Sequence, residues 1–478
     1  MSASASFRDP LRVVAIADAD SFVKWSASLL DTVPGIRRHL LIVRTPLTVS
    51  PSQQRAALAG TSFADGGVTR IGFDELDGWL GGHSPDVVVL AGRGPFVRLV
   101  ARRIDRLRRR PVVVSGLPGM SIPAQRGALE YRRESDLLVL HSHREERAFA
   151  ELGRRIGVVM PTALATLPFA RPDSAGIARA DGSTHAGSAG HRTASGAVGH
   201  GSTRAFSARA VALAERPAPR VLGTDLVFAA QALVPAERHD RAALAQVLRQ
   251  AAEADPTRRV VVKLRSRPGE AETHLERDAY ADLLGARPAN LVFSHQPMAT
   301  ALESAEGLVT VSSTAIVEAI ARDIPVIALD MFGVSKPLLN TVFVGSGLLG
   351  GAEEVIGRRF RHPHPQWLRD NYFHRAAEST WWEQVEQLVV LRREGGLRAR
   401  PVPVGRGGAL HAAWHRASVL GAEDRTLVGR VALGIGSPLV RGIVALRQAR
   451  GRAAEDTWAD AGTDYTLEPT PHRDPIRR

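Results

Sequence analysis

The chain has 478 residues, too many for one compact core, and its hydrophobic content of 44% is ordinary for a globular protein, so we expect two or three folded units. It contains no cysteine, which excludes disulfide frameworks, zinc–thiolate sites and a cysteine nucleophile, and which agrees with a cytoplasmic location. The net charge of +13 favours anionic partners such as phosphorylated substrates, anionic lipid or nucleic acid, although GC-rich coding, which enriches Arg and Ala, would produce a similar excess.

The first residues, MSASASFRDP, have no long apolar core, so we expect no secretory signal. Residues 10–170 then carry six apolar runs, most of them rich in β-branched residues, with helical patterns such as 94–110 between them. Strands that are apolar on both faces and alternate with helices are typical of a doubly wound parallel sheet. The six expected strands lie within 11–20, 37–45, 85–94, 110–119, 135–145 and 151–168.

A second α/β unit is expected over residues 217–364, after a flexible linker at 171–216 that is rich in Gly, Ser, Ala and His. Residues 365–395 are expected to form helices that cross back to the first unit, and residues 396–478 a basic helical tail with a disordered end. The strands of the second unit are expected within 220–231, 258–266, 289–296, 307–314 and 324–330.

Three hydroxyl residues, Ser312, Ser313 and Thr314, lie where one of these expected strands ends and a helix begins. Unpaired backbone N–H groups and the positive end of the helix dipole make such a corner suitable for a phosphate. Glu318, four residues after Thr314, lies on the same helix face and is placed to accept ribose hydroxyls. Ordinary helix capping by Ser and Thr is the alternative.

A second cluster follows another strand of the same sheet. Lys263, Arg265 and Arg267 alternate along the chain and therefore share one face, with Glu270 close behind. Arg and Lys on one side of a strand end favour a phosphate or carboxylate ligand, whereas a solvated edge is the alternative. His295, after the strand in 289–296, is a further candidate for the donor pocket.

Candidate residues of the first unit also follow strands. Asp18 and Asp20 could take a proton from an acceptor hydroxyl, although Asp20 could equally cap a helix. The remaining candidates, expected to contact the acceptor, are Lys24, Arg93, Gly116, Gly119 and Ser121. No dinucleotide fingerprint, P-loop or metal-binding cluster occurs in the sequence, so we expect no cofactor and no metal ion.

With these residues, the chain resembles a GT-B glycosyltransferase, specifically an actinobacterial glycosyltransferase family of unknown function. The resemblance rests on DLVFAAQALVP, VVVKLRSRPGE, THLERDAY and VTVSSTAIVEA and covers roughly residues 10–170 and 217–385. It is more remotely similar to bacterial polysialyltransferases, capsule Kdo transferases and CDP-glycerol phosphotransferases. Those relatives carry a His-Pro motif, a serine pair that binds a cytidine nucleotide, and an acidic loop in the first domain.

The serine pair of these relatives matches Ser312 and Ser313, but Arg267–Pro268 stands at the His-Pro position and no carboxylate lies near 115–119. Because Arg is a poor general acid, the relatives' protonation of the leaving group does not carry over. The resemblance implies two Rossmann-like domains that face a cleft, a cytidine-linked or other nucleotide-sugar donor, and a role in polysaccharide or cell-envelope synthesis.

The sequence therefore predicts a metal-independent, inverting transferase that moves a sugar from a nucleotide-sugar to a glycan or a lipid-linked acceptor. Its expected location is the cytoplasm or the inner face of the plasma membrane, with no nucleic-acid partner. Two alternatives stay open: a two-domain sugar-nucleotide epimerase, and a non-enzymatic binder of polyanions or membranes that uses the Arg-rich residues 98–110 and 425–452.

Overall fold

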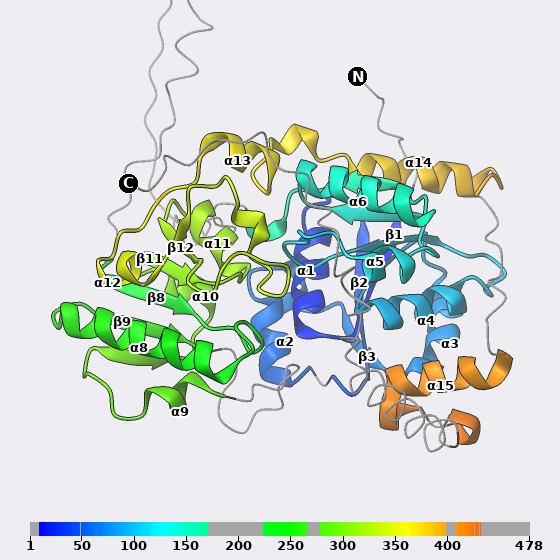
Figure 1. The fold of residues 1–478 in the computed structure, drawn as a ribbon. Coiled ribbons are helices and arrows are strands. Elements are labelled where there is room, and N and C mark those ends of the chain that lie inside the picture. The colour runs from blue at the N-terminus through cyan, green and yellow to red at the C-terminus, as the bar shows by residue number, and fades with distance from the viewer. Residues whose placement is uncertain are drawn as a thin grey trace, which may run out of the picture.

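The computed structural model describes residues 9–47, 49–170, 223–264, 278–397, 408–424, 426–429 and 431. Two parallel β-sheets lie side by side and define two lobes (Figure 1). The expected linker at 171–216 lies outside the described residues, as do most of the expected basic tail and its end.

The first lobe is built on a seven-stranded sheet in the order β3-β2-β1-β4-β5-β6-β7, in which every neighbouring pair is parallel. Its elements are β1 (Arg12–Ala17), α1 (Asp20–Leu30), β2 (Arg37–Val43), α2 (Pro51–Leu58), β3 (Val68–Ile71), α3 (Leu76–His83), β4 (Val87–Ala91), α4 (Gly94–Ile104), β5 (Val112–Gly116), α5 (Arg126–Glu130), β6 (Leu137–Leu140), α6 (His143–Ile156) and β7 (Thr162–Leu164).

The second lobe is built on a six-stranded parallel sheet in the order β10-β9-β8-β11-β12-β13. Its elements are β8 (Asp225–Ala229), α8 (Arg238–Ala254), β9 (Val260–Lys263), α9 (Tyr280–Leu284), β10 (Leu291–Ser294), α10 (Met298–Ala301), β11 (Ala305–Thr310), α11 (Ala315–Ala321), β12 (Val326–Leu329), β13 (Leu349–Gly350) and α12 (Ala352–Ile356).

Both sheets are sandwiched between helices because their strands are apolar on both faces; β4, for example, is buried along its whole length. In the first lobe, α1 and α2 cover one face, and α3 and α4 cover the other. Each sheet has a switch point, where the strand order reverses direction, between β1 and β4 in the first lobe and between β8 and β11 in the second. Ligands of such sheets bind beyond the carboxyl ends of the strands at this point.

The segment after the second sheet returns to the first lobe. It contains α13 (Pro365–Asp370) and α14 (Trp381–Arg393), and α14 packs on the face that α1 and α2 cover. A hydrogen bond of 2.9 Å from the Thr380 amide to the Leu164 carbonyl attaches the start of α14 to the first lobe. The later helix α15 (Gly408–Leu420) covers the opposite face beside α4 (Figure 1).

The two lobes share one hydrophobic core. Leu129 and Phe149 from the first lobe belong to the same buried cluster as Leu302 and Phe343 from the second lobe and Trp367 of α13. Two doubly wound parallel sheets that face each other, with a helix returning from the second lobe to the first, form the GT-B arrangement. The fold class expected from the sequence is confirmed.

Several local expectations differ from the structure. The short strand β3 was not expected, because only its last residue, Ile71, is buried and its apolar signal is weak. Asp20 does not cap α1: the N-cap residue is Ala19, without a side-chain hydrogen bond, and Asp20 is the first helical residue. The helical pattern that begins at 365 is broken into α13 and α14 by a turn and a short 3-10 helix at Ala376–Glu378.

Candidate functional site

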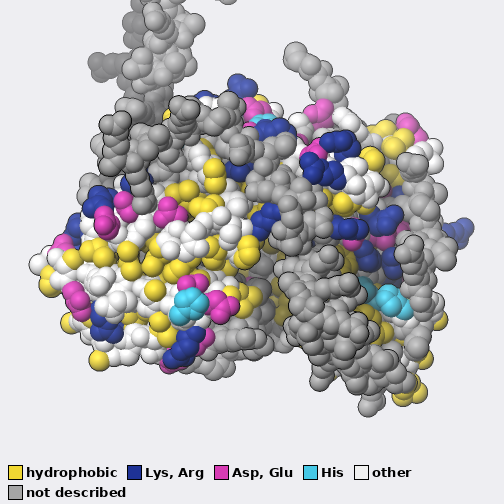
Figure 2. All heavy atoms as spheres, viewed as in Figure 1, with side chains coloured by type: hydrophobic (Ala, Val, Ile, Leu, Met, Phe, Trp, Pro, Cys, Tyr) yellow, Lys and Arg dark blue, Asp and Glu magenta, His cyan; other side chains and the backbone are white. Residues whose placement is uncertain are grey.

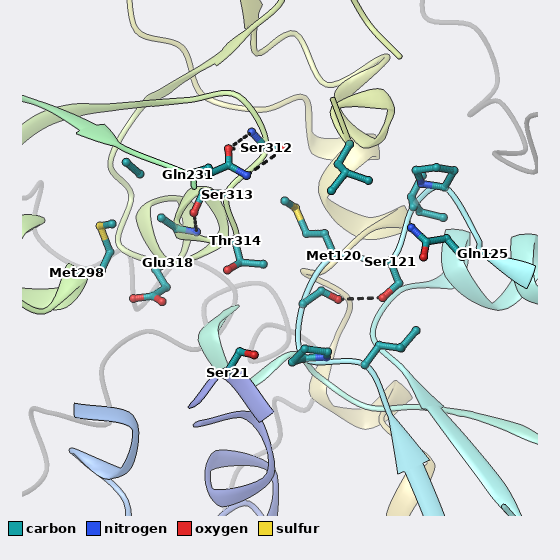
Figure 3. A pocket seen from close by; sticks show the side chains of 18 of the residues that line it. Ser21, Met120, Ser121, Gln125, Gln231, Met298, Ser312, Ser313, Thr314 and Glu318 are labelled. Carbon is teal, nitrogen blue, oxygen red and sulfur yellow. Dashed lines mark hydrogen bonds between the residues drawn. The ribbon is translucent and has the colours of Figure 1, made fainter. Parts of the chain in front are cut away.

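A cavity of about 540 Å³ lies between the lobes. The first lobe contributes mainly residues 117–123 and Gln125 after β5, and the second contributes the carboxyl ends of β8, β9 and β11. The cavity therefore lies at the β8/β11 switch point, where the topology of the second sheet places ligands. Figure 3 shows its lining, with side chains from both lobes turned toward the same space.

The three hydroxyl residues of the β11–α11 corner all line this cavity. Ser312 is buried, with 7% of its surface exposed, whereas Ser313 and Thr314 are partly exposed. The corner lines the space between the lobes, and the side chain of Gln231 lies against its first serine. Its hydroxyl groups are thus in position to contact a ligand.

The backbone N–H groups of this corner were expected to be unpaired, and that expectation is wrong for three of them. The Ser312 amide donates to Oε1 of Gln231 at 2.9 Å, the Ser313 amide to Oγ1 of Thr310 at 3.2 Å, and the Ala315 amide to Oγ of Ser313 at 3.3 Å. The helix that follows has seven residues, so its dipole is short. A ligand would therefore meet mainly side chains at this corner.

Gln231 is a lining residue that the sequence analysis did not single out. Its Oε1 accepts from the Ser312 amide, and its Nε2 donates to Oγ of Ser312 at 3.1 Å. The carboxamide of Gln231 therefore bonds both the backbone N–H and the hydroxyl of Ser312 (Figure 3). Its position directly after the β8 run was a usable signal, because polar residues after strands of a parallel sheet lie at the ligand-binding edge.

An ion pair joins the two lobes at Glu318, one of the residues that line the cavity. Nζ of Lys24 on α1 lies 2.7 Å from Oε1 of Glu318 on α11, and 14% of the Glu318 side chain is exposed. Lys24 was predicted to contact the acceptor and Glu318 the donor ribose. The structure places the two side chains against each other, so a substrate that binds Glu318 would compete with Lys24.

The loop of the first lobe passes close to the second lobe at Gly119. A Cβ atom placed there would lie 2.5 Å from Cγ2 of Thr314, closer than non-bonded carbon atoms come. Gly119 therefore lets the loop after β5 pass next to the hydroxyl corner of the other lobe. Ser121, two residues further on, also lines the cavity, and its Oγ donates to the Gly119 carbonyl at 3.2 Å.

Gly116, predicted to let an acceptor approach the backbone, has a different neighbour. It is buried at the end of β5, and a Cβ there would lie 2.3 Å from Cζ2 of Trp25. Trp25 in turn donates from Nε1 to Nε2 of His141 at 2.8 Å, and Nδ1 of His141 bonds the Ala165 carbonyl at 2.9 Å. Burial lowers the pKa of His141 to about 4, so this histidine is a neutral part of the core.

The two carboxylates predicted as catalytic have different surroundings. The side chain of Asp18 is completely buried; it accepts from the amide and from Nε of Arg93, each at 3.3 Å. Burial raises the pKa of Asp18 to about 6, and Arg93 partly offsets this effect. Asp20 is partly exposed and precedes Ser21, which lines the cavity (Figure 3). Arg93, predicted to contact the acceptor, is therefore paired with Asp18 of its own lobe.

The basic strand end is described in part. Lys263 at the end of β9 lines the cavity, and its Nζ contacts the Leu264 carbonyl. Arg265, Arg267 and Glu270 lie outside the described residues. His295 follows β10 and is not among the lining residues; its buried Nδ1 has no hydrogen-bond partner within the described part of the chain.

A buried glutamate holds the first-lobe wall in place. Glu145 of α6 accepts from the backbone amides of Ser121 and His141, each at 2.8 Å, and from the hydroxyl of Tyr372 at 2.9 Å. Tyr372 belongs to the returning segment after α13. Burial raises the pKa of Glu145 to about 7, although all three donors favour the charged form. Glu145 is therefore a positioning residue for the loop at 117–125.

This burial predicts a pH-dependent contribution to stability. The folded-state pKa of about 7 exceeds the ordinary value of 4.5, so the folded protein keeps a proton that the unfolded chain releases. The contribution of Glu145 is then fully present below about pH 4.5 and falls as the pH rises toward 7. We expect the free energy of unfolding of the wild type, minus that of Glu145→Gln, to decrease over this range in urea titrations at pH 5, 6 and 7.

Subtracting the two proteins cancels the other titrating groups, including His141. The Glu253→Gln variant, at an exposed position of α8, is the control for the exchange of a glutamate for a glutamine. A wild-type advantage over Glu145→Gln that grows with pH would contradict the raised pKa.

Among the described residues, no helix combines the length and apolar character needed to cross a bilayer, and no cluster of three potential metal ligands occurs.

Comparisons with known proteins give a family and a set of weak structural likenesses. No curated protein matches the chain. The UDP-GlcNAc 2-epimerase from Neisseria meningitidis, bound to UDP-GlcNAc, is 13% identical, with 80% of this chain and 100% of that chain covered and a TM-score of 0.42. The S. aureus MnaA–UDP structure is 10% identical, with 82% and 99% covered and a TM-score of 0.47. The glycosyltransferase of kitacinnamycin is 13% identical, with 81% and 96% covered and a TM-score of 0.33.

The family comparison covers most of the two lobes. A family model described as "Putative glycosyltransferase (DUF6716)" matches residues 13–388, a range that includes both sheets and most of α14. The chain therefore belongs to this family.

Proposed function

We propose that the protein is a glycosyltransferase that binds a nucleotide-sugar in the cavity between its lobes and transfers the sugar to a hydroxyl group of an acceptor. One observation carries this proposal: Lys263 and the hydroxyls of Ser312, Ser313 and Thr314 converge on one cavity at the switch point of the second sheet. A cation and several hydroxyl donors in a cleft between two lobes are suited to a nucleotide phosphate. Membership of the family supports the same activity.

In this proposal the second lobe holds the donor. Lys263 and the serine pair would contact the phosphate and neutralise the charge that develops as the glycosidic bond breaks. Glu318 would bind the ribose hydroxyls after its ion pair with Lys24 has opened. Arg265, Arg267, Glu270 and His295 remain predicted donor contacts, as does the preference for a cytidine-linked sugar.

The first lobe would hold the acceptor, with Gly119, Ser121 and Lys24 facing it. For an inverting transfer, a base must take the proton of the attacking hydroxyl. Asp20 is the better candidate, because it is partly exposed beside Ser21 at the cavity, whereas the side chain of Asp18 is completely buried against Arg93. A lipid-linked acceptor would bring the protein to the inner face of the plasma membrane.

The epimerase alternative is less well supported by the cavity. An epimerase needs an acid and a base on opposite sides of the sugar. Within the described lining, Glu318 is the one carboxylate, and it is paired with Lys24. The likeness to structures of epimerases does not identify the second acid or base in this chain.

The polyanion-binding alternative is weakened in part, because three arginines of residues 98–110 are paired, whereas most of 425–452 lies outside the described residues. Lys and Arg side chains gather on the first lobe in Figure 2, interleaved with acidic ones. Arg102 pairs with Glu134, Arg103 with Asp74 and Asp77, and Arg110 with Asp136. These cations are already neutralised by the protein itself.

A thermal-shift titration tests the proposal. CMP, CDP, UDP and GDP are added to the wild type, and we expect at least one of them, at about 100 times its Kd, to raise the Tm by roughly 5 °C. Ser313→Ala should lose most of this shift, because it removes a hydroxyl that lines the cavity. Ser418→Ala, on the exposed side of α15, should keep it. If no nucleotide stabilises the wild type, the proposed function is wrong.

A further inference from the structure

The hydroxyl of Ser312 meets a side chain that comes from another strand end of the second sheet. Gln231 follows β8, Ser312 follows β11, and both residues line the cavity (Figure 3). Nε2 of Gln231 lies 3.1 Å from Oγ of Ser312, and Oε1 of Gln231 lies 2.9 Å from the Ser312 amide nitrogen. These two bonds determine which polar groups of Ser312 are left for a ligand.

The direction of both bonds follows from the groups that make them. A backbone N–H can only donate, so the carbonyl oxygen of the Gln231 carboxamide must face the Ser312 amide. The NH₂ group then faces Oγ of Ser312, and because an amide NH₂ can only donate, Oγ accepts. One accepting position of the hydroxyl is thus occupied by the protein, whereas its proton takes no part in this bond.

The proton of the Ser312 hydroxyl has no short acceptor among the described residues. They offer it only Oε1 of Gln231, at 3.5 Å, which is longer than the roughly 2.5–3.0 Å of an ordinary O–H···O hydrogen bond. That oxygen already accepts from the Ser312 amide, and Oγ1 of Thr310 is a further donor to it at 3.4 Å. The O–H group of Ser312 is therefore able to donate to a ligand in the cavity.

A buried arginine fixes the backbone of Gln231. Arg241 of α8 is 1% exposed; its Nη1 donates to the Gln231 carbonyl at 2.9 Å, and its Nε donates to the Asp278 carbonyl at 2.7 Å. Its guanidinium also lies over the ring of the buried Tyr280, 4.4 Å from the ring centre. Because its main chain is held in this way, Gln231 presents its carboxamide to Ser312 with little reorganisation.

We propose that Gln231 is a positioning residue that turns the Ser312 hydroxyl into a hydrogen-bond donor for the phosphate of the nucleotide. The inference rests on the proposed function and names the residue that prepares its phosphate contact. Ionised phosphate oxygens only accept hydrogen bonds, so they match a hydroxyl that is fixed as a donor. In the proposed transfer this bond stabilises the negative charge on the leaving phosphate, and the proton stays on Oγ.

Calorimetric titration of Gln231→Leu tests this role. The probe is whichever of CMP, CDP, UDP and GDP raises the Tm of the wild type most, and its nucleoside is the control without phosphate. Leucine is similar in size but neither donates nor accepts, so we expect the nucleotide to bind about tenfold more weakly and the nucleoside to bind unchanged. An equal loss for both ligands would show a purely structural role and overturn the proposal. Tighter nucleotide binding would also overturn it, because the carboxamide would then compete with the phosphate for the Ser312 amide.

Ser312→Ala shows whether Gln231 acts through the hydroxyl. This variant alone should also bind the nucleotide about tenfold more weakly. Gln231→Leu/Ser312→Ala should bind it within about twofold of Ser312→Ala, because the hydroxyl that Gln231 orients is already gone. Two losses that multiply to about 100-fold would show that Gln231 acts independently of Ser312, contrary to the proposal.

Gln231→Glu adds a readout that packing does not produce. The ionised carboxylate would accept the proton of the Ser312 hydroxyl and repel the phosphate, whereas the protonated carboxyl has the same donor and acceptor pattern as the carboxamide. Because the phosphate favours the protonated form, the Kd of the variant divided by that of the wild type should fall from about 100 at pH 8 to below about 10 at pH 5. A ratio that is the same at both pH values would overturn the proposal.

Gln246→Leu is the matched control, at an exposed position of α8 away from the cavity lining, and should bind the nucleotide as the wild type does. If none of the four nucleotides binds the wild type, the transferase proposal fails and the role of Gln231 fails with it. If a nucleotide binds and Gln231→Leu binds it as tightly as the wild type, the role of Gln231 is wrong and the transferase proposal stands.

Discussion

Gly119→Ala is expected to weaken nucleotide binding by about 10- to 100-fold. The added Cβ would lie 2.5 Å from Cγ2 of Thr314, so either the lobes move apart or Thr314 rotates its methyl group away and turns its hydroxyl at the same time. Both responses disturb a cavity that needs the two lobes together. Overpacking of this kind costs about 1–3 kcal/mol, and each 1.4 kcal/mol corresponds to tenfold in Kd.

A second substitution should restore binding. Thr314→Ser removes the methyl group that the new Cβ meets and keeps the hydroxyl, so Gly119→Ala/Thr314→Ser should bind the nucleotide within a few-fold of the wild type. Calorimetric Kd values for the four proteins give the coupling between the two positions. Additive losses, with no recovery in the double variant, would show that the contact between Gly119 and Thr314 does not control the site.

Lys263→Met is expected to lower the affinity for a nucleoside diphosphate by about 10- to 100-fold. Hydrogen bonds to charged groups contribute about 1.5–3 kcal/mol each, and Met keeps most of the length of the side chain without its charge. Because the proposed partner is the phosphate, the affinity for uridine, which has none, should stay unchanged. Calorimetric titration with UDP and uridine measures both.

Arg238→Met is the control for the loss of one positive charge. Arg238 is on α8, its side chain is 76% exposed, and it pairs with Asp278 away from the cavity lining. It should bind UDP as the wild type does. An equal loss of UDP affinity in both variants would indicate long-range attraction by the net positive charge instead of a phosphate contact at Lys263.

The sequence predicted the elements that are strongly apolar. The segments that form β1, β4 and β11 are mostly buried and contain β-branched residues. Their assignment to a parallel sheet also predicts that the residues after them lie at the ligand-binding edge. This reasoning located Ser312–Thr314 and Lys263 in one cavity. It could not find β3, because a four-residue edge strand with one buried side chain has almost no hydrophobic signal.

Contacts between distant parts of the chain were not predictable. Lys24 and Glu318 are 294 residues apart in sequence, and nothing local indicates that they pair. The side chain of Gln231 accepts from the Ser312 amide, which the local sequence around the start of α11 predicts to be unpaired. Gly116 and Gly119 looked alike in sequence, yet one faces Trp25 and the other faces Thr314 of the opposite lobe.

Amide hydrogen exchange with and without a nucleotide-sugar tests the central claim most directly. UDP-GlcNAc, CMP-sialic acid and GDP-mannose are each added at saturation, and peptides that cover 117–121 and 312–318 are followed. Occupation of the inter-lobe cavity predicts slower exchange in both peptides with at least one of the three compounds. Protection of neither peptide by any of them, or protection confined to another surface, would contradict the assignment of this cavity as the donor site.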